Sequence, residues 1–263
     1  MPEAEPVLSS DPTARSDLNP AARSAALVLA IWRPAHVAWG LMQLVKGPLT
    51  VNRAPGMRWR KVLGSGHEGG FGLRPGLNRL GLFSAFDGPE AARDWLDRSA
   101  EVEQWRTRAE RWLTVLLEPV SSRGSWSGHT LTPPTPVAPQ ALGASGGVRI
   151  ASLTRASIRP YQARRFWSLS PAAEASLARA PGCMLAVGLG EAPLLRQATF
   201  SLWQDQAAMD AYARSGAHLD AIRQAYSQGF FSESMFARFR VLEVRGNWPL
   251  SQIAKPARQG PAP

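Results

Sequence analysis

The sequence predicts an α+β protein in which two tandem copies of one unit close into a single barrel. Three observations support this fold class. Matching segments recur in both halves in the same order, a Pro- and Gly-rich stretch separates the halves, and each half shows the same succession of expected strands and helices. The 263 residues, 44% of them hydrophobic, suffice for two small units with their own cores.

Three short segments of the first half match three segments of the second. The pairs are Arg-Ala-Pro-Gly-Met at 53–57 with Arg-Ala-Pro-Gly-Cys at 179–183, Phe-Ser-Ala-Phe at 83–86 with Phe-Ser-Leu-Trp at 200–203, and Arg-Gly-Ser-Trp at 123–126 with Arg-Gly-Asn-Trp at 245–248. The spacing between partners drifts from pair to pair, as loop insertions would cause. Three matches in one order indicate a duplication.

The stretch between the halves holds four prolines and then several glycines, which is typical of a linker. Both ends of the chain contain prolines and few apolar residues, which favours disordered tails. The predicted organisation is a tail at 1–23, a first unit at 24–126, a linker at 127–147, a second unit at 148–249 and a tail at 250–263.

Each half is expected to begin with a strand and a helix. The β-rich runs at 27–33 and 148–155 favour strands. Helical stretches follow at 37–45 in the first half and from 163 to 169 and beyond in the second.

The Arg-Ala-Pro-Gly segments predict turns, because proline fixes φ and glycine accepts a positive φ. Each turn is expected to open a second strand, at 57–63 and at 183–189. A third strand follows at 80–86 and at 197–203.

Asp87 and Asp205 are expected to cap the next helices, since a carboxylate can accept hydrogen bonds from the free N–H groups of a first helical turn. These helices carry Trp95, Trp105 and Trp112 in the first half, and Met209, Tyr212 and Ile222 in the second. A last strand is predicted at 113–117 and at 238–244.

The resulting order, βαββαβ, is that of the ferredoxin-like unit. Helices cover one face of its sheet, and the other face is apolar and open. Two copies can bury their open faces against each other. We therefore expect duplicated ferredoxin-like units that form a fused dimeric α/β-barrel, with a central cavity suited to an apolar ligand or a cofactor.

The net charge of +10 excludes few partners by itself. The basic residues are scattered, and the sequence has neither a basic helix nor an RNA-binding aromatic motif, so we expect no nucleic-acid partner. An anionic membrane surface remains a candidate partner.

The single cysteine excludes an internal disulfide framework, and no segment resembles a secretory signal or a transmembrane span. We expect a cytoplasmic protein.

Two motif matches lack the context that their chemistry needs. Residues 64–69 fit G-x-G-x-x-G, but the glycines and the proline that follow do not favour a helix that could bind a pyrophosphate. Residues 143–147 fit G-x-S-x-G, but they precede a strand rather than a helix, unlike a nucleophile elbow. Cys183 matches Met57 of the first half, which indicates an apolar packing position rather than a metal ligand.

The four histidines, His36, His67, His129 and His218, lie far apart in the sequence and show no spacing of close metal ligands. His218 differs from the others because it lies late in, or just after, the last expected helix of the second half. The matching position of the first half holds Glu101, as expected if only one half keeps a ligand. By position alone, a histidine bonded to a backbone carbonyl is the simpler interpretation.

Several segments together resemble the spheroidene monooxygenase family, from about residue 27 to residue 248. They are Gly-Leu-Met-Gln-Leu at 40–44, Pro-Gly-Met-Arg-Trp-Arg-Lys at 55–61, Arg-Gly-Ser-Trp-Ser-Gly at 123–128, Leu-Thr-Arg-Ala-Ser-Ile-Arg-Pro at 153–160, Gly-Leu-Gly-Glu-Ala-Pro-Leu-Leu at 188–195 and Phe-Ala-Arg-Phe-Arg-Val-Leu at 236–242.

The resemblance implies an O2-dependent oxidation of acyclic carotenoids such as spheroidene to a C2 ketone, by two successive hydroxylations and loss of water. It also implies a haem, a ferredoxin-type electron donor and contact with the inner photosynthetic membrane. A haem iron needs an axial ligand, and the resemblance makes His218 the predicted haem ligand and metal-binding residue. Arg155, Arg159 and Arg196 are candidate partners for the haem propionates. No catalytic residue is assigned.

Three alternatives remain open. The protein could be a barrel that stores, chaperones or degrades haem, or a non-enzymatic carotenoid- or lipid-binding barrel in which His218 is structural. A third alternative is a cofactor-independent oxygenase, which would need a substrate with an activated carbon.

Overall fold

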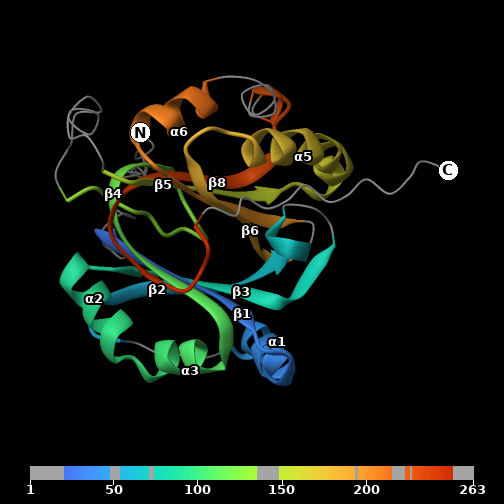
Figure 1. Cartoon of the computed structure of the whole chain (residues 1–263). Helices are drawn as coiled ribbons and strands as arrows, with labels where there is room; N and C mark the ends of the chain where they lie inside the picture. The colour runs from blue at the N-terminus through green and yellow to red at the C-terminus, as the bar shows by residue number, and fades with distance from the viewer. Residues whose placement is uncertain are drawn as a thin grey trace, which may run out of the picture.

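The computed structural model of the 263-residue chain describes residues 21–47, 54–70, 74–134, 148–192, 195–214, 223–225 and 227–250. Figure 1 shows strands in the middle of the molecule, with α1, α2 and α3 on one side and α5 and α6 on the opposite side. The layers are therefore helices, barrel, helices, and the α+β class is confirmed.

The elements follow one another in a similar order in both halves. The first half contains β1 (Ser24–Trp32), α1 (Val37–Lys46), β2 (Met57–Gly66), β3 (Pro75–Phe86), α2 (Pro89–Arg98), α3 (Ala100–Arg108) and β4 (Ala109–Gly124). The second half contains β5 (Ile150–Ile158), α5 (Ala163–Ala178), β6 (Cys183–Ala192), β7 (Arg196–Trp203), α6 (Gln206–Ala213) and β8 (Phe231–Gly246). Short 3-10 turns at Pro34–His36, His67–Gly69 and Pro160–Gln162 accompany them.

The eight strands form one closed antiparallel barrel in the order β1-β3-β2-β6-β7-β5-β8-β4. Closure leaves no strand without a neighbour on either side. The two junctions between the halves differ in length. Strands β4 and β8 pair from Leu113 opposite Gly246 to Gly124 opposite Met235, whereas β2 and β6 pair only at Gly64 with Gly190 and at Ser65 with Leu189.

Strand β1 shows why these sequences form buried strands. Its residues are almost all buried, and they alternate between two cores. Leu27 and Leu29 belong to the cluster inside the barrel. Val28 and Trp32 belong to the cluster between the sheet and the helices. A strand that is buried on both faces reads as a continuous apolar run.

Packed side chains occupy the barrel interior, where we expected a ligand cavity. The ring centroids of Trp59 and Trp126 lie 5.5 Å apart, and Phe83 lies 5.6 Å from Trp126 and 6.4 Å from Phe239. Such aromatic contacts stabilise a core beyond the area they bury.

Two expectations about the helices need correction. Asp205 does cap α6, since its carboxylate accepts the Ala208 N–H at 2.8 Å. The N-cap of α2, however, is Gly88, and Asp87 forms an ion pair with Arg58 instead. Trp112 is not on a helix, because α3 ends at Arg108 and β4 already begins at Ala109.

The glycine-rich segment at 64–69 and Cys183 both lie in the described part of the chain. Strand β2 ends at Gly66 and a 3-10 turn follows, so no α-helix opens at residues 64–69, as predicted. Cys183 is buried in the small cluster beneath α5 and α6. Burial raises the pKa of its thiol to about 11, against a weaker opposing hydrogen bond with the Leu185 carbonyl, which fits a packing role. Residues 143–147 lie outside the described part.

Candidate functional site

The helix-facing side of the sheet differs between the two halves. Leu27 lies opposite Phe83 in the first half, and Leu153 lies opposite Phe200 in the second. By this register Ser152, Thr154 and Thr199 occupy the positions of Ala26, Val28 and Leu82. In the first half, these three apolar residues belong to the same buried cluster as Trp95 of α2 and Trp105 of α3. The second half has hydroxyl groups at the same positions.

These hydroxyls border a cavity of about 130 Å³, hereafter the inner cavity. It lies between the sheet and the helices α5 and α6. Its lining residues are Ser152, Thr154, Leu177, Thr199, Ser201, Trp203, Met209, Tyr212, Ala213 and Arg238.

Three of the lining hydroxyls have no protein partner among the described residues. Ser201 accepts a hydrogen bond from Trp203 Nε1 at 2.9 Å, but the side chains of Ser152, Thr154 and Thr199 make no hydrogen bond within the described part of the chain. A half-buried hydroxyl without a partner is costly unless water or a ligand binds it. The inner cavity can therefore bind a hydrogen-bonding group.

A larger, open cleft of about 860 Å³ lies between α5 and α6, hereafter the outer cleft. Its walls are mostly small residues, and its volume falls in the range of about 300–1,000 Å³ that is usual for ligand pockets. The lining residues are Ala172, Ala175, Ser176, Arg179, Ala180, Pro181, Gly182, Gln204, Asp205, Ala207, Ala208, Ala211 and Tyr212.

Tyr212 lines both the inner cavity and the outer cleft. Its ring lies 5.3 Å from that of Trp203. Burial, together with the nearby Cys183, raises the pKa of the Tyr212 hydroxyl, and a hydrogen bond with Ser176 opposes this shift only in part. The hydroxyl therefore keeps its proton near neutral pH.

Two arginines bring guanidinium groups to this region. Arg238 lines the inner cavity and lies 3.2 Å from Asp210, a carboxylate that also lies 3.2 Å from Arg214. Arg179 lies at the rim of the outer cleft and forms no ion pair with a described carboxylate. A guanidinium suits a carboxylate of a ligand because it donates two parallel hydrogen bonds.

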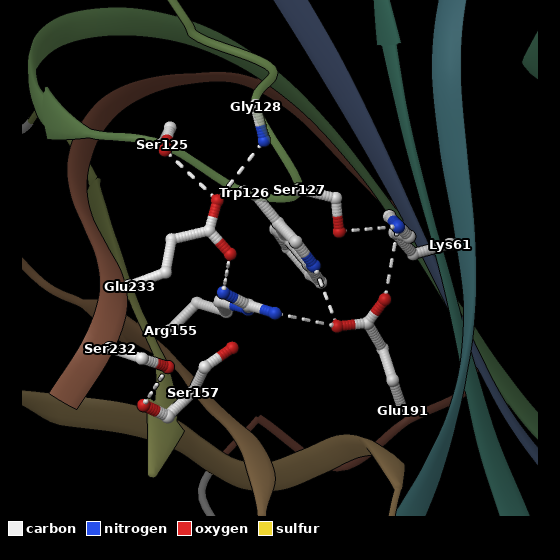
Figure 2. Close-up of polar contacts among 10 residues, drawn as sticks. All are labelled: Lys61, Ser125, Trp126, Ser127, Gly128, Arg155, Ser157, Glu191, Ser232 and Glu233. Carbon is white, nitrogen blue, oxygen red and sulfur yellow. Dashed lines mark hydrogen bonds and ion pairs between the residues drawn. The ribbon is translucent and has the colours of Figure 1, made fainter. Parts of the chain in front are cut away.

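A second polar cluster lies inside the barrel, near the β2–β6 junction. Figure 2 shows the Arg155 guanidinium between the carboxylates of Glu191 and Glu233. The Arg155 side chain is only 2% exposed, and its Nη2 lies 3.1 Å from Glu191 Oε2. Glu191 also lies 3.0 Å from Lys61 Nζ, so the cluster joins β2 of the first half to β5, β6 and β8 of the second.

The same cluster holds the loop that follows β4. Trp126 Nε1 donates to Glu191 at 2.9 Å, and Ser125 Oγ and Gly128 N donate to Glu233 at 2.9 and 3.0 Å. The Trp126 ring also lies 5.8 Å from the Arg155 guanidinium carbon, as in a cation–π contact (Figure 2).

The charges of this cluster balance. Burial alone would raise the pKa of Glu191, but the hydrogen bond from Trp126 and the ammonium of Lys61, with further help from Arg155, hold it below its usual value. Two cations thus face two ionised carboxylates. The cluster has the chemistry of a structural connection between the halves rather than that of an acid–base site, which would need a carboxyl group with a raised pKa.

The structure does not place the predicted haem-binding residues together. His218 lies outside the described residues, five positions after Ala213 at the end of α6. Of the candidate propionate partners, Arg155 is bound to carboxylates inside the barrel. Arg159 donates to the Phe231 carbonyl and to Tyr161, and Arg196 is exposed at the start of β7. None of these three arginines lines the inner cavity or the outer cleft.

Sequence reasoning missed the hydroxyls, Tyr212 and Arg238 as site residues. No local signal marks Ser152 and Thr154, because they align with Ala26 and Val28 only through the observed strand register. Within the described residues, no group of three or more His, Cys, Asp or Glu side chains could hold a metal ion. No helix found there is long and apolar enough to cross a membrane.

The chain is similar to curated proteins over most of its length. It is 50% identical over 215 residues to "Spheroidene monooxygenase" of Rubrivivax gelatinosus, which covers 82% of this chain and 80% of the relative. It is 36% identical over 215 residues to the protein of that name in Rhodobacter capsulatus, covering 81% and 88%. No protein-family model matches the chain.

Solved structures share the fold at low sequence identity. A crystal structure of aldoxime dehydratase matches with a TM-score of 0.56 at 12% identity, covering 90% of this chain and 88% of the other. Aldoxime dehydratase OxdRE, in complex with butyraldoxime, matches with a TM-score of 0.53 at 8% identity, covering 84% and 79%. At such identities the likeness concerns the fold alone.

Proposed function

The chain belongs to the spheroidene monooxygenase family, and from this premise we propose that it oxidises acyclic carotenoids such as spheroidene with O2. The observation that carries the proposal is the 50% identity over 82% of the chain. The proposed product is the C2 ketone, formed by two hydroxylations at one carbon and loss of water from the diol. Each hydroxylation consumes one O2 and two electrons, which we assign to a ferredoxin-type donor.

A haem is the proposed cofactor, and His218 is the residue that would hold its iron. The described residues fit such a group. The outer cleft is large enough, its alanine walls are apolar, and Arg179 at its rim is free to meet a carboxylate. His218 follows α6, the helix that lines the cleft through Ala208 and Ala211. When bound, the haem would supply the oxidant for an unactivated methylene group, which no side chain can supply.

The protein's own residues position the substrate and control polarity. Tyr212, which keeps its proton, can donate a hydrogen bond at the junction of cleft and cavity. Arg238 brings a positive charge to the inner cavity, and Asp210 balances it.

The remaining parts of the proposal concern organisation and location. We propose that both halves are copies of one ferredoxin-like unit, at residues 24–126 and 148–249, joined by the linker at 127–147 and flanked by tails at 1–23 and 250–263. The strand orders β4-β1-β3-β2 and β8-β5-β7-β6 support this. We place the protein in the cytoplasm, peripheral to the inner photosynthetic membrane, where its apolar substrate resides.

The test is turnover by the purified protein loaded with haem. Spheroidene in detergent micelles, O2 and a reduced ferredoxin should yield a ketone that chromatography with mass spectrometry detects, with its oxygen labelled when ¹⁸O2 is used and the product is analysed before exchange with water. Binding of haem without any carotenoid product would favour a haem-handling barrel. Binding of carotenoid with neither haem nor product would favour a carrier.

A further inference from the structure

We propose that the inner cavity binds a hydrogen-bond-accepting oxygen group at one end of a large, otherwise apolar ligand whose body occupies the outer cleft. This inference rests on the proposed function, since it assigns a role to one part of the same site. It goes beyond the family assignment by naming Ser152, Thr154 and Thr199 as the residues that recognise this group.

The two halves differ at three matching positions on the helix-facing side of the sheet. At the positions of Ala26, Val28 and Leu82 the first half fills the space between sheet and helices with packed apolar side chains. The second half places three hydroxyls there and leaves a cavity. The three hydroxyls belong to half-buried residues that border an unfilled space, so a hydrogen-bonding group of a ligand can take the place of the water that otherwise meets them.

The size of the inner cavity limits what enters. Its volume of about 130 Å³ is that of roughly four water molecules at about 30 Å³ each. A carotenoid or a haem cannot fit inside, but an ether, ketone or carboxylate group at the edge of either can. The cavity is therefore a subsite for an end group and not the whole ligand site.

The chemistry of the lining sets the polarity of that group. Arg238 can only donate hydrogen bonds, and Tyr212 keeps its proton and can donate as well. The Ser152, Thr154 and Thr199 hydroxyls can turn toward an acceptor. Because Tyr212 borders both spaces, a ligand in the outer cleft can extend its oxygen group past this ring. Two sources share this chemistry: the oxygen-bearing end of the carotenoid and a carboxylate of the cofactor.

The experiment removes two hydroxyls without changing side-chain volume, in the double variant Thr154→Val with Thr199→Val. The matched control is Thr114→Val, a buried threonine of β4 that lines neither space. Affinities for spheroidene, which bears a methoxy group, and for neurosporene, which is a pure hydrocarbon, are measured by quenching of tryptophan fluorescence. Haem affinity is measured by titration followed in the visible spectrum.

We expect the wild type and the control to prefer spheroidene, and the double variant to lose about 10-fold of that preference, as two hydrogen bonds of ordinary strength predict. If carotenoid preference is unchanged but haem binds about 10-fold more weakly, the proposal holds with a cofactor carboxylate as the source. The proposal is overturned if the folded double variant matches the wild type in both measurements. A second variant, Thr199→Leu, installs the first-half residue and should weaken the same ligand by filling the cavity.

These binding results stand apart from the proposed activity. Wild-type protein that binds spheroidene and discriminates by the methoxy group, but yields no ketone, would refute the oxidation and leave the subsite intact. If the wild type converts spheroidene to the ketone but the double variant shows unaltered affinities, the proposed oxidation stands and the subsite is refuted.

Discussion

Nη2 of Arg155 lies 3.1 Å from Oε2 of Glu191, inside a barrel whose interior is otherwise mostly apolar. Glu191 in turn contacts Lys61 on β2 and Trp126 in the loop after β4. Glu191 therefore connects the two halves near their shorter junction, where β2 and β6 align at only two positions, and Arg155 holds Glu191 from within the second half. Ion pairs between side chains therefore supplement the few backbone hydrogen bonds between β2 and β6.

Removal of the Arg155 guanidinium should destabilise the fold strongly. Arg155→Met leaves two carboxylates inside the barrel without their shared cation, and loss of one partner from a buried pair typically costs about 3–5 kcal/mol. The matched control is Arg245→Met, whose ion pairs with Glu243 and Asp97 lie at the surface and should contribute less than about 1 kcal/mol. Urea unfolding measures both. Equal, small losses in the two variants would contradict the assigned role.

The stability that Glu191 contributes should depend on pH. Its pKa in the folded protein lies below its value in the unfolded chain. The contribution is therefore fully present above the unfolded pKa, about 4.3, and is lost as the pH falls through the lower, folded value. The free energy of unfolding of wild type minus that of Glu191→Gln should be constant from pH 7 to pH 5 and shrink below pH 4. A difference that stays constant down to pH 3 would refute this assignment.

Substitution of two glycines near the Arg155 cluster can distinguish the cost of backbone strain from the cost of a steric clash. Gly124 and Gly128 both have positive φ, +81° and +77°. A Cβ at Gly124 would lie 2.0 Å from the Ser234 carbonyl oxygen, whereas a Cβ at Gly128 would meet nothing within 4 Å. Gly128→Ala should cost only the strain, about 1–2 kcal/mol, and Gly124→Ala clearly more. Similar unfolding free energies for the two variants would show that the β4–β8 contact is looser than described.

The succession of strands and helices could be predicted from the sequence because the duplication doubles each local signal. The lengths of the strands and the capping residues of the helices were less predictable. Strand β4 begins at Ala109 rather than 113, because pairing with β1 reaches back to Ala109, a tertiary contact that local pattern does not reveal. Asp87 was a reasonable cap by residue type, but its carboxylate pairs with Arg58, which is 29 residues away.

The candidate site was less predictable than the fold. Serine and threonine in a strand have many causes, so Ser152, Thr154 and Thr199 stand out only when the two halves are aligned by their observed register. Arg155 could have been placed better. It lies in phase with Ala151 and Leu153, both inside the barrel, and strand alternation therefore directs it inward, away from any haem on the helix side.

The most direct test of the account is the visible absorption spectrum of the protein produced with haem supplied. Wild type and the control His67→Ala, which removes an exposed histidine far from α6 in the sequence, should both show a Soret band, and His218→Ala should lose or shift it. A wild type without the band, or a His218→Ala spectrum identical to that of the wild type, would contradict the proposed cofactor or its proposed ligand respectively.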